Sequence, residues 1–90
     1  MKKDDNKSRK LIFDEEGLKL LAKRLKEIRS EKGLSQEELA YRSEITLSQI
    51  ARIETVRINP TVSTIFKIAR ALEVPLNELF NFELTPSPNE

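Results

Sequence analysis

The chain has 90 residues, of which 34% are charged and 38% hydrophobic, and its formal net charge is +1. This length allows one small domain. The fractions of charged and hydrophobic residues are those of a soluble globular protein. Cysteine and histidine are both absent, which removes disulfides, thiolate nucleophiles, the commonest general base and the commonest metal ligand. We therefore expect a protein that is not an enzyme, with no catalytic residue, no metal and no cofactor.

The charges are unevenly distributed along the chain. Residues 1–32 carry eleven Lys/Arg against seven Asp/Glu, whereas residues 71–90 carry four Glu and no Lys or Arg. Such asymmetry allows a polyanion-binding surface, although the same charges can simply solvate helix faces. No apolar run has the length of a membrane span or a signal peptide, which predicts a cytoplasmic protein without a membrane partner. We expect tails at residues 1–13 and 83–90 around a domain of residues 14–82.

The first predicted helix begins after Asp14, a favoured N-cap residue. Its apolar residues recur every three or four positions and predict one buried stripe, at Leu18, Leu21, Leu25 and Ile28. Gly33 suits the left-handed position that follows a helix, so the helix should end just before it.

Two capping boxes come next, Ser35–Glu38 and Thr46–Gln49. They predict short helices over residues 36–43 and 47–54, with a turn at Glu44 and Ile45. A tight pair of this kind is typical of a helix-turn-helix, whose second helix enters the DNA major groove. An ordinary helical hairpin within a bundle is the alternative.

Two further helices complete the predicted fold. Thr61 caps a fourth helix, and Pro75 suits the first turn of a fifth. The apolar face of the fourth helix is predicted at Ile65, Phe66, Ile68, Ala69 and Leu72. Five helices and no confident strand make the predicted class all-α. The apolar runs 11–13 and 80–84 should either pack on the domain as extended segments or pair as short strands, within one chain or across a dimer.

Several segments in order resemble the XRE/Cro-type helix-turn-helix family over roughly residues 18–80. They are Leu34-Ser35-Gln36-Glu37-Glu38-Leu39-Ala40, Ile50-Ala51-Arg52-Ile53-Glu54, Asn59-Pro60-Thr61 and the run from Ile68 to Phe80. The resemblance implies a compact five-helix, lambda-repressor-like DNA-binding domain with short extended ends. It implies a sequence-specific transcriptional regulator, a repressor that binds double-stranded palindromic DNA as a homodimer through helix 47–54. The alternative, which the apolar ends favour, is an antitoxin-like or adaptor protein whose main partner is another protein.

The resemblance also implies roles for single residues. Gln36 matches a glutamine that contacts a DNA phosphate and braces helix 47–54. Four positions at the head of that helix flank or read bases: Thr46, Leu47, Ser48 and Gln49. Arg52 is expected to reach a base edge or a phosphate, and Arg57 and Asn59 to contact the DNA backbone.

Three further expectations concern single positions. The resemblance implies that Arg29 and Glu54 meet as a partly buried ion pair, which would connect the first helix to the end of helix 47–54. Many relatives carry a glycine shortly after the matching glutamate, whereas Thr55-Val56 stand here. We therefore expect the turn to take another backbone path. Leu47 should pack on a thymine methyl group, unless it packs back on helix 36–43.

Overall fold

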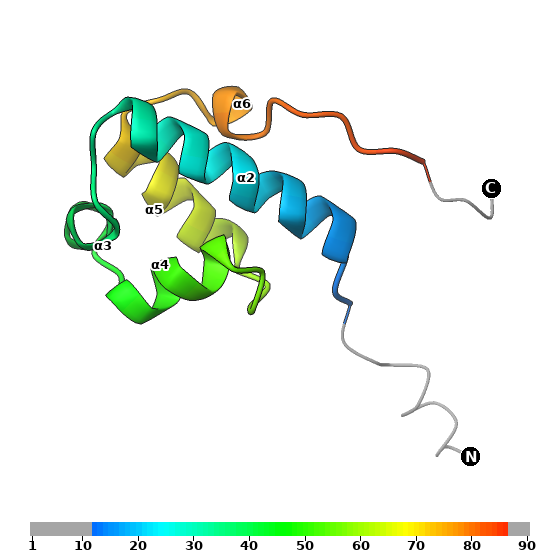
Figure 1. The fold of residues 1–90 in the computed structure, drawn as a ribbon, viewed down its shortest axis with the longest axis horizontal. Coiled ribbons are helices and arrows are strands. Elements are labelled where there is room, and N and C mark those ends of the chain that lie inside the picture. The colour runs from blue at the N-terminus through cyan, green and yellow to red at the C-terminus, as the bar shows by residue number, and fades with distance from the viewer. Residues whose placement is uncertain (1–11, 87–90) are drawn as a thin grey trace, which may run out of the picture.

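The computed structural model describes residues 12–86, which form five α-helices and no strand (Figure 1). The helices are α2 (Glu15–Glu31), α3 (Gln36–Ser43), α4 (Leu47–Glu54), α5 (Val62–Leu72) and α6 (Leu76–Leu79). The all-α, five-helix prediction is confirmed. Residues 80–86 begin with a turn and contain no strand. Residues 1–11 and 87–90, which make up most of the two predicted tails, lie outside the described residues.

The helix starts follow from short polar side chains that satisfy the first free backbone N–H groups. Asp14, Ser35, Thr46 and Thr61 each stand at an N-cap and accept a hydrogen bond from the backbone three residues on. In α3 the bond is reciprocated, because the N–H of Ser35 donates to Glu38 at 2.9 Å. This bond lowers the pKa of Glu38. Its contribution to stability is therefore present above the ordinary glutamate pKa and is lost as the pH falls through the lowered value.

Pro75 differs from its predicted position. It stands at the N-cap of α6, one residue before the first turn, with extended backbone angles and no side-chain capping bond. The fixed φ of proline suits this site equally well, and its carbonyl accepts from the N–H of Glu78 at 2.9 Å.

Four helices end in one backbone motif, in which a left-handed residue follows the last turn. The left-handed residues are Gly33, Glu44, Val56 and Glu73, with φ between 58° and 71°. In each case two N–H groups bond back to carbonyls of the last turn, as in a Schellman motif. A residue with a Cβ atom is strained in this conformation, which glycine adopts without strain. Three of the four helix ends carry such a strained residue, Glu44, Val56 and Glu73.

Glu73→Gly is expected to raise the free energy of unfolding by about 0.5–1 kcal/mol. Releasing the left-handed strain gains roughly 1–2 kcal/mol, and the extra freedom of glycine in the unfolded chain takes back about 0.5–1 kcal/mol. Gly33→Ala is the matched reverse change, since a Cβ at Gly33 meets no atom within 4 Å. It should lower stability by a similar amount in urea denaturation. Two changes of the same sign would show that backbone strain does not govern these helix ends.

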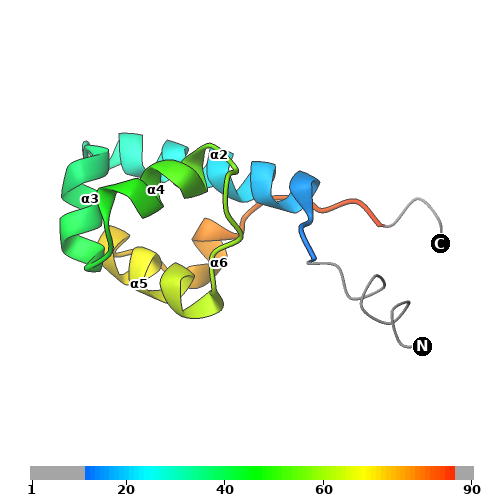
Figure 2. The same ribbon diagram turned by 90° about the horizontal axis from the view of Figure 1, so that it is seen from below.

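The helices form two layers, with α2 and α4 in one and α5 and α6 in the other, and α3 closes one end (Figure 2). The core contains Leu21, Leu25 and Ile28 of the predicted α2 stripe and the inward residues of every other helix. Leu18, the fourth predicted stripe residue, is only half-buried and lies outside this core. Its fully buried large side chains are Leu25, Leu39, Ile50, Ile68, Leu72 and Leu79. Phe66 was wrongly predicted to be buried. It is 40% exposed and borders an apolar pocket together with Leu76 and Phe80.

Candidate nucleic-acid interface

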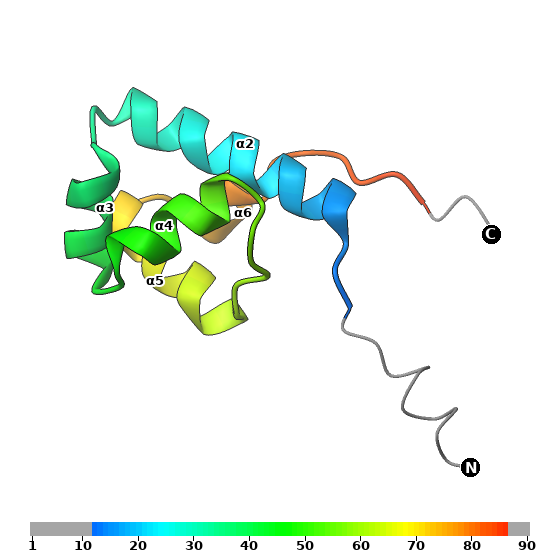
Figure 3. The ribbon, with the colours of Figure 1, turned by 60° about the horizontal axis from the view of Figure 1, so that its bottom comes forward.

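Helix α4 lies across the face of the domain shown in Figure 3, with α3 at one end and α2 and α5 on either side. Its inward side carries Ile50 and Ile53, which are 0% and 3% exposed. This narrow apolar stripe holds the helix on the core and leaves the side with Leu47, Ser48 and Arg52 exposed. The helix is eight residues long and would not be stable alone, so its position depends on these contacts.

The first turn of α4 is fixed by its own capping box. The N–H of Gln49 donates to Thr46 Oγ1 at 3.0 Å, and the N–H of Thr46 donates to Gln49 Oε1 at 3.2 Å. Both side chains were predicted as DNA-contacting residues. Here each is engaged in holding the helix start, and Gln49 is half-buried.

The exposed side of α4 brings several predicted residues together. Ser48 and Arg52 are exposed, and Leu47 keeps 42% of its surface accessible. Ser48, Arg52 and Thr55 follow at i, i+4 and i+7, which places them on one line along the helix. Sequence reasoning missed Thr55, although this spacing could have indicated it. We call Leu47, Ser48, Ala51, Arg52 and Thr55 the α4 face.

The far end of α4 is held by a buried carboxylate. Glu54 has a side chain only 2% exposed, and it accepts from Arg29 Nε at 2.7 Å and Arg29 Nη2 at 3.0 Å. The third guanidinium nitrogen, Nη1, donates to the carbonyl of Leu34 at 2.9 Å. The pair therefore connects α2, the loop before α3 and the end of α4 in one hydrogen-bonded unit.

Gln36, the first residue of α3, joins the same unit. Its Nε2 donates to Glu54 Oε1 at 2.8 Å, so Glu54 receives three charge-assisted bonds. This is the bracing contact that the resemblance implied. Together with the capping box it fixes both ends of α4, and therefore the direction of the α4 face, relative to α3.

The turn after α4 corrects one prediction. We expected Thr55-Val56 to take a path different from that of glycine, but Val56 adopts the left-handed conformation with φ of 60°. The N–H groups of Val56 and Arg57 bond to Ile53 and Arg52 at 3.2 and 2.7 Å. These bonds offset a left-handed strain of roughly 1–2 kcal/mol.

Arg57 and Asn59 both follow this turn, but their side chains differ in their surroundings. Arg57 is exposed directly after α4. Asn59 instead donates from Nδ2 to the carbonyl of Ile12 at 3.2 Å, and so it lies against the N-terminal segment. Asn59 is therefore engaged with the N-terminal segment, whereas the side chain of Arg57 is free of such a contact among the hydrogen bonds of the described residues.

The basic residues of α2 are mostly paired. Lys19 and Lys23 lie 3.5 Å from glutamates one turn away, and Arg24 binds Glu78 at 2.8 Å. Arg52 is the one cation of α4. The α4 face therefore combines one positive charge with small polar and apolar side chains. None of the helices between residues 12 and 86 is both long and apolar enough to span a membrane.

Comparison with known proteins gives the same fold. A family model described as Helix-turn-helix (HTH_3) matches residues 25–79. The HTH-type transcriptional regulator PuuR of Escherichia coli is 41% identical over 59 residues, which are 66% of this chain and 32% of PuuR. The immunity repressor protein of Bacillus phage phi105 is 35% identical over 63 residues, 70% of this chain and 44% of the repressor. The chain thus spans about a third of the length of PuuR and less than half of the length of the phage repressor.

A solved structure covers more of its own length. The restriction-modification controller protein C.AhdI from Aeromonas hydrophila has a TM-score of 0.68 and 40% identity, over 70% of this chain and 96% of C.AhdI. The helix pair α3–α4, the match to the family model and this similarity agree. The chain belongs to the XRE-type helix-turn-helix family of transcriptional regulators.

Proposed function

We propose that the chain binds double-stranded DNA sequence-specifically through the α4 face and acts as a transcriptional repressor. The observation that carries this proposal is the fixation of α4. Glu54 at one end and the Thr46–Gln49 box at the other hold a helix whose outer side bears Leu47, Ser48 and Arg52. The major groove of DNA admits one α-helix, and the bases can be distinguished by their edges there.

The remaining roles divide between base reading and backbone contact. Leu47, Ser48 and Arg52 are assigned to base edges, with Arg52 able to reach guanine or a phosphate. Gln36 and Arg57 flank the helix and are assigned to phosphates. Thr46 and Gln49 are assigned to orienting the start of α4. Asn59 is assigned to holding the N-terminal segment through its hydrogen bond to Ile12.

The operator is expected to be a palindrome bound by a homodimer. One eight-residue helix presents too few side chains for tight specific binding, so two copies on half-sites about 34 Å apart are needed. Repression is the direction suggested by the name of the phage relative, the immunity repressor protein.

Leu47 provides the test of base reading. Its accessible apolar surface can pack on a thymine C5-methyl group, which uracil lacks. With an operator selected from random duplexes, replacing the contacted thymine by uracil should weaken wild-type binding about fivefold, or ~1 kcal/mol. The affinities of Leu47→Ala for the thymine duplex and the uracil duplex should differ by no more than about twofold. The measurement is equilibrium binding by fluorescence anisotropy.

Thermal melts serve as the control, because Leu47→Ala removes little buried surface and should leave the fold intact. Equal losses for wild type and variant on the uracil duplex would remove Leu47 from the base-reading set. A sharp fall in the melting temperature of the variant would assign Leu47 to packing on α3 instead.

A further inference from the structure

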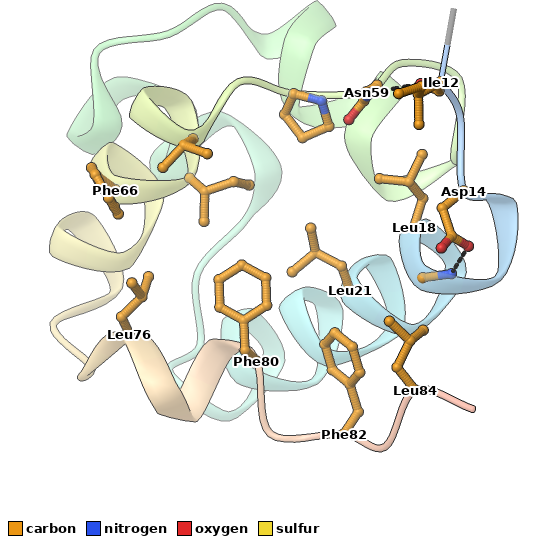
Figure 4. Close-up of a pocket in the computed structure, with 14 residues that line it drawn as sticks. Ile12, Asp14, Leu18, Leu21, Asn59, Phe66, Leu76, Phe80, Phe82 and Leu84 are labelled. Atoms are coloured by element: carbon orange, nitrogen blue, oxygen red, sulfur yellow. Dashed lines mark hydrogen bonds between the residues drawn. The ribbon is translucent and has the colours of Figure 1, made fainter. Parts of the chain in front are cut away.

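Helix α2 is held on both sides by an arginine. On one side Arg24 donates from Nε to the carbonyl of Glu78 and from Nη2 to its carboxylate, both at 2.8 Å. On the same side Leu21 lines an apolar pocket next to α6 (Figure 4). On the other side Arg29 binds Glu54 of α4. These contacts fix the rotation of α2 about its axis, and therefore the direction of its remaining side chains.

Lys26 lies on the α4 side of α2. Ala22, Lys26 and Arg29 follow at i, i+4 and i+7, which places them on one line along the helix. Ala22 is 3% exposed and Arg29 is half-buried, whereas Lys26 is exposed. Lys26 therefore lies at the outer edge of the seam between α2 and α4, one turn before the arginine that binds the end of α4.

Lys26 is also the one cation of α2 without a carboxylate partner among the residues that the structure describes. The other four of its five cations each lie within 3.5 Å of a glutamate oxygen: Lys19, Lys23, Arg24 and Arg29. The positions three and four residues away from Lys26 on α2 hold two cations and two uncharged residues. No neighbouring carboxylate on α2 therefore offsets the attraction of Lys26 for an anion.

A helix α4 that enters the major groove brings this seam close to a DNA backbone. The groove is about 12 Å wide, and a helix with its side chains is about 10–12 Å across. Because the helix fills the groove, the phosphates of the groove walls pass against the elements that adjoin it. Helix α2 contacts α4 along one side (Figure 3), and its edge there carries Lys26.

We propose that Lys26 is a further DNA contact, whose ammonium group binds a backbone phosphate at the wall of the major groove beside α4. The proposal rests on the proposed function, because it takes α4 as the helix in the groove. Lysine binds phosphate as a point charge and reads no base. With Gln36 and Arg57, Lys26 gives phosphate contacts from three separate elements, and such contacts fix the orientation of a recognition helix.

The salt dependence of DNA binding by Lys26→Gln tests the proposal. Each lost phosphate contact lowers the slope of log K against log salt concentration by about 0.9. Lys26→Gln should show this change and bind the selected operator about five- to tenfold more weakly near 0.1 M salt. The loss should be similar on an unrelated duplex. Lys26→Arg keeps the charge and should restore both the slope and the affinity.

Arg70→Gln is the matched control, because it also removes one positive charge from an exposed helix position. Arg70 lies on α5, in the layer opposite α2 and α4 (Figure 2), so its salt slope should equal that of the wild type. A wild-type slope for Lys26→Gln would overturn the proposal. Equal reductions in both variants would also overturn it, since they would show an effect of net charge alone.

The unrelated duplex separates this proposal from the proposed function, because binding to it requires no base reading. If the wild type selects no motif while Lys26→Gln still lowers the slope on this duplex, sequence-specific binding is refuted and the phosphate contact is supported. A wild type that binds neither duplex would overturn both proposals.

Discussion

Replacing Glu54 by alanine is expected to lower the free energy of unfolding by about 3–5 kcal/mol. The substitution removes the acceptor of three hydrogen bonds and leaves the guanidinium of Arg29, only 18% exposed, without its carboxylate. Uncompensated charge in a poorly hydrated site carries the main cost. The total stability of a domain of this size is about 5–13 kcal/mol, so the loss should be large in urea denaturation.

Glu44→Ala is the matched control. Glu44 pairs with Lys67 at 3.4 Å, but its side chain is 79% exposed, so the change should cost no more than about 1 kcal/mol. The double variant Arg29→Met/Glu54→Leu removes both charges and should be more stable than Glu54→Ala. A Glu54→Ala protein within about 1 kcal/mol of the wild type would mean that the pair is hydrated in solution.

Ser48→Glu is expected to weaken binding to operator DNA at least about 100-fold, close to 3 kcal/mol. Ser48 is the second residue of α4 and is exposed on the α4 face. A carboxylate there would face the phosphates and base edges of the major groove, where like charges repel strongly. The same carboxylate is favourable near a helix N-terminus, so the stability of the protein should not fall.

Ser63→Glu separates this effect from the added charge alone. Ser63 is also exposed and is also the second residue of a helix capped by a threonine, in α5. On a duplex with one half-site, where self-association plays no part, Ser63→Glu should bind within about threefold of the wild type. Equal losses in the two variants would place the DNA contact somewhere other than α4.

The helix starts could be predicted because they depend on local chemistry. Asp14, Ser35, Thr46 and Thr61 each bond to a backbone group three residues away, so a short stretch of sequence contains the whole interaction. The helices over 36–43 and 47–54 also end where they were predicted to end, but the left-handed residue after a helix could be predicted only at Gly33. At Val56 a β-branched residue takes the left-handed conformation, and packing of the whole domain outweighs the local preference.

The features that could not be predicted depend on contacts between residues that are distant in the sequence. The bond from Gln36 to Glu54 spans 18 residues and was expected only through the family resemblance. The bond from Asn59 to Ile12 spans 47 residues and was not expected at all. It holds Asn59 against the N-terminal segment. The exposure of Phe66 has the same origin, because the periodicity of one helix shows which residues are apolar but not how wide a stripe its neighbours cover.

Selection of bound duplexes from a random pool, carried out in parallel with the wild type and with Leu47→Arg, tests the central claim that the α4 face reads DNA sequence. The wild type should enrich a motif of two symmetric half-sites with thymine at the position that faces Leu47. Leu47→Arg should enrich the same motif with guanine at that one position, because arginine bonds to two acceptors of guanine in the major groove. No enriched motif with the wild type, or identical motifs from both proteins, would contradict base reading by α4.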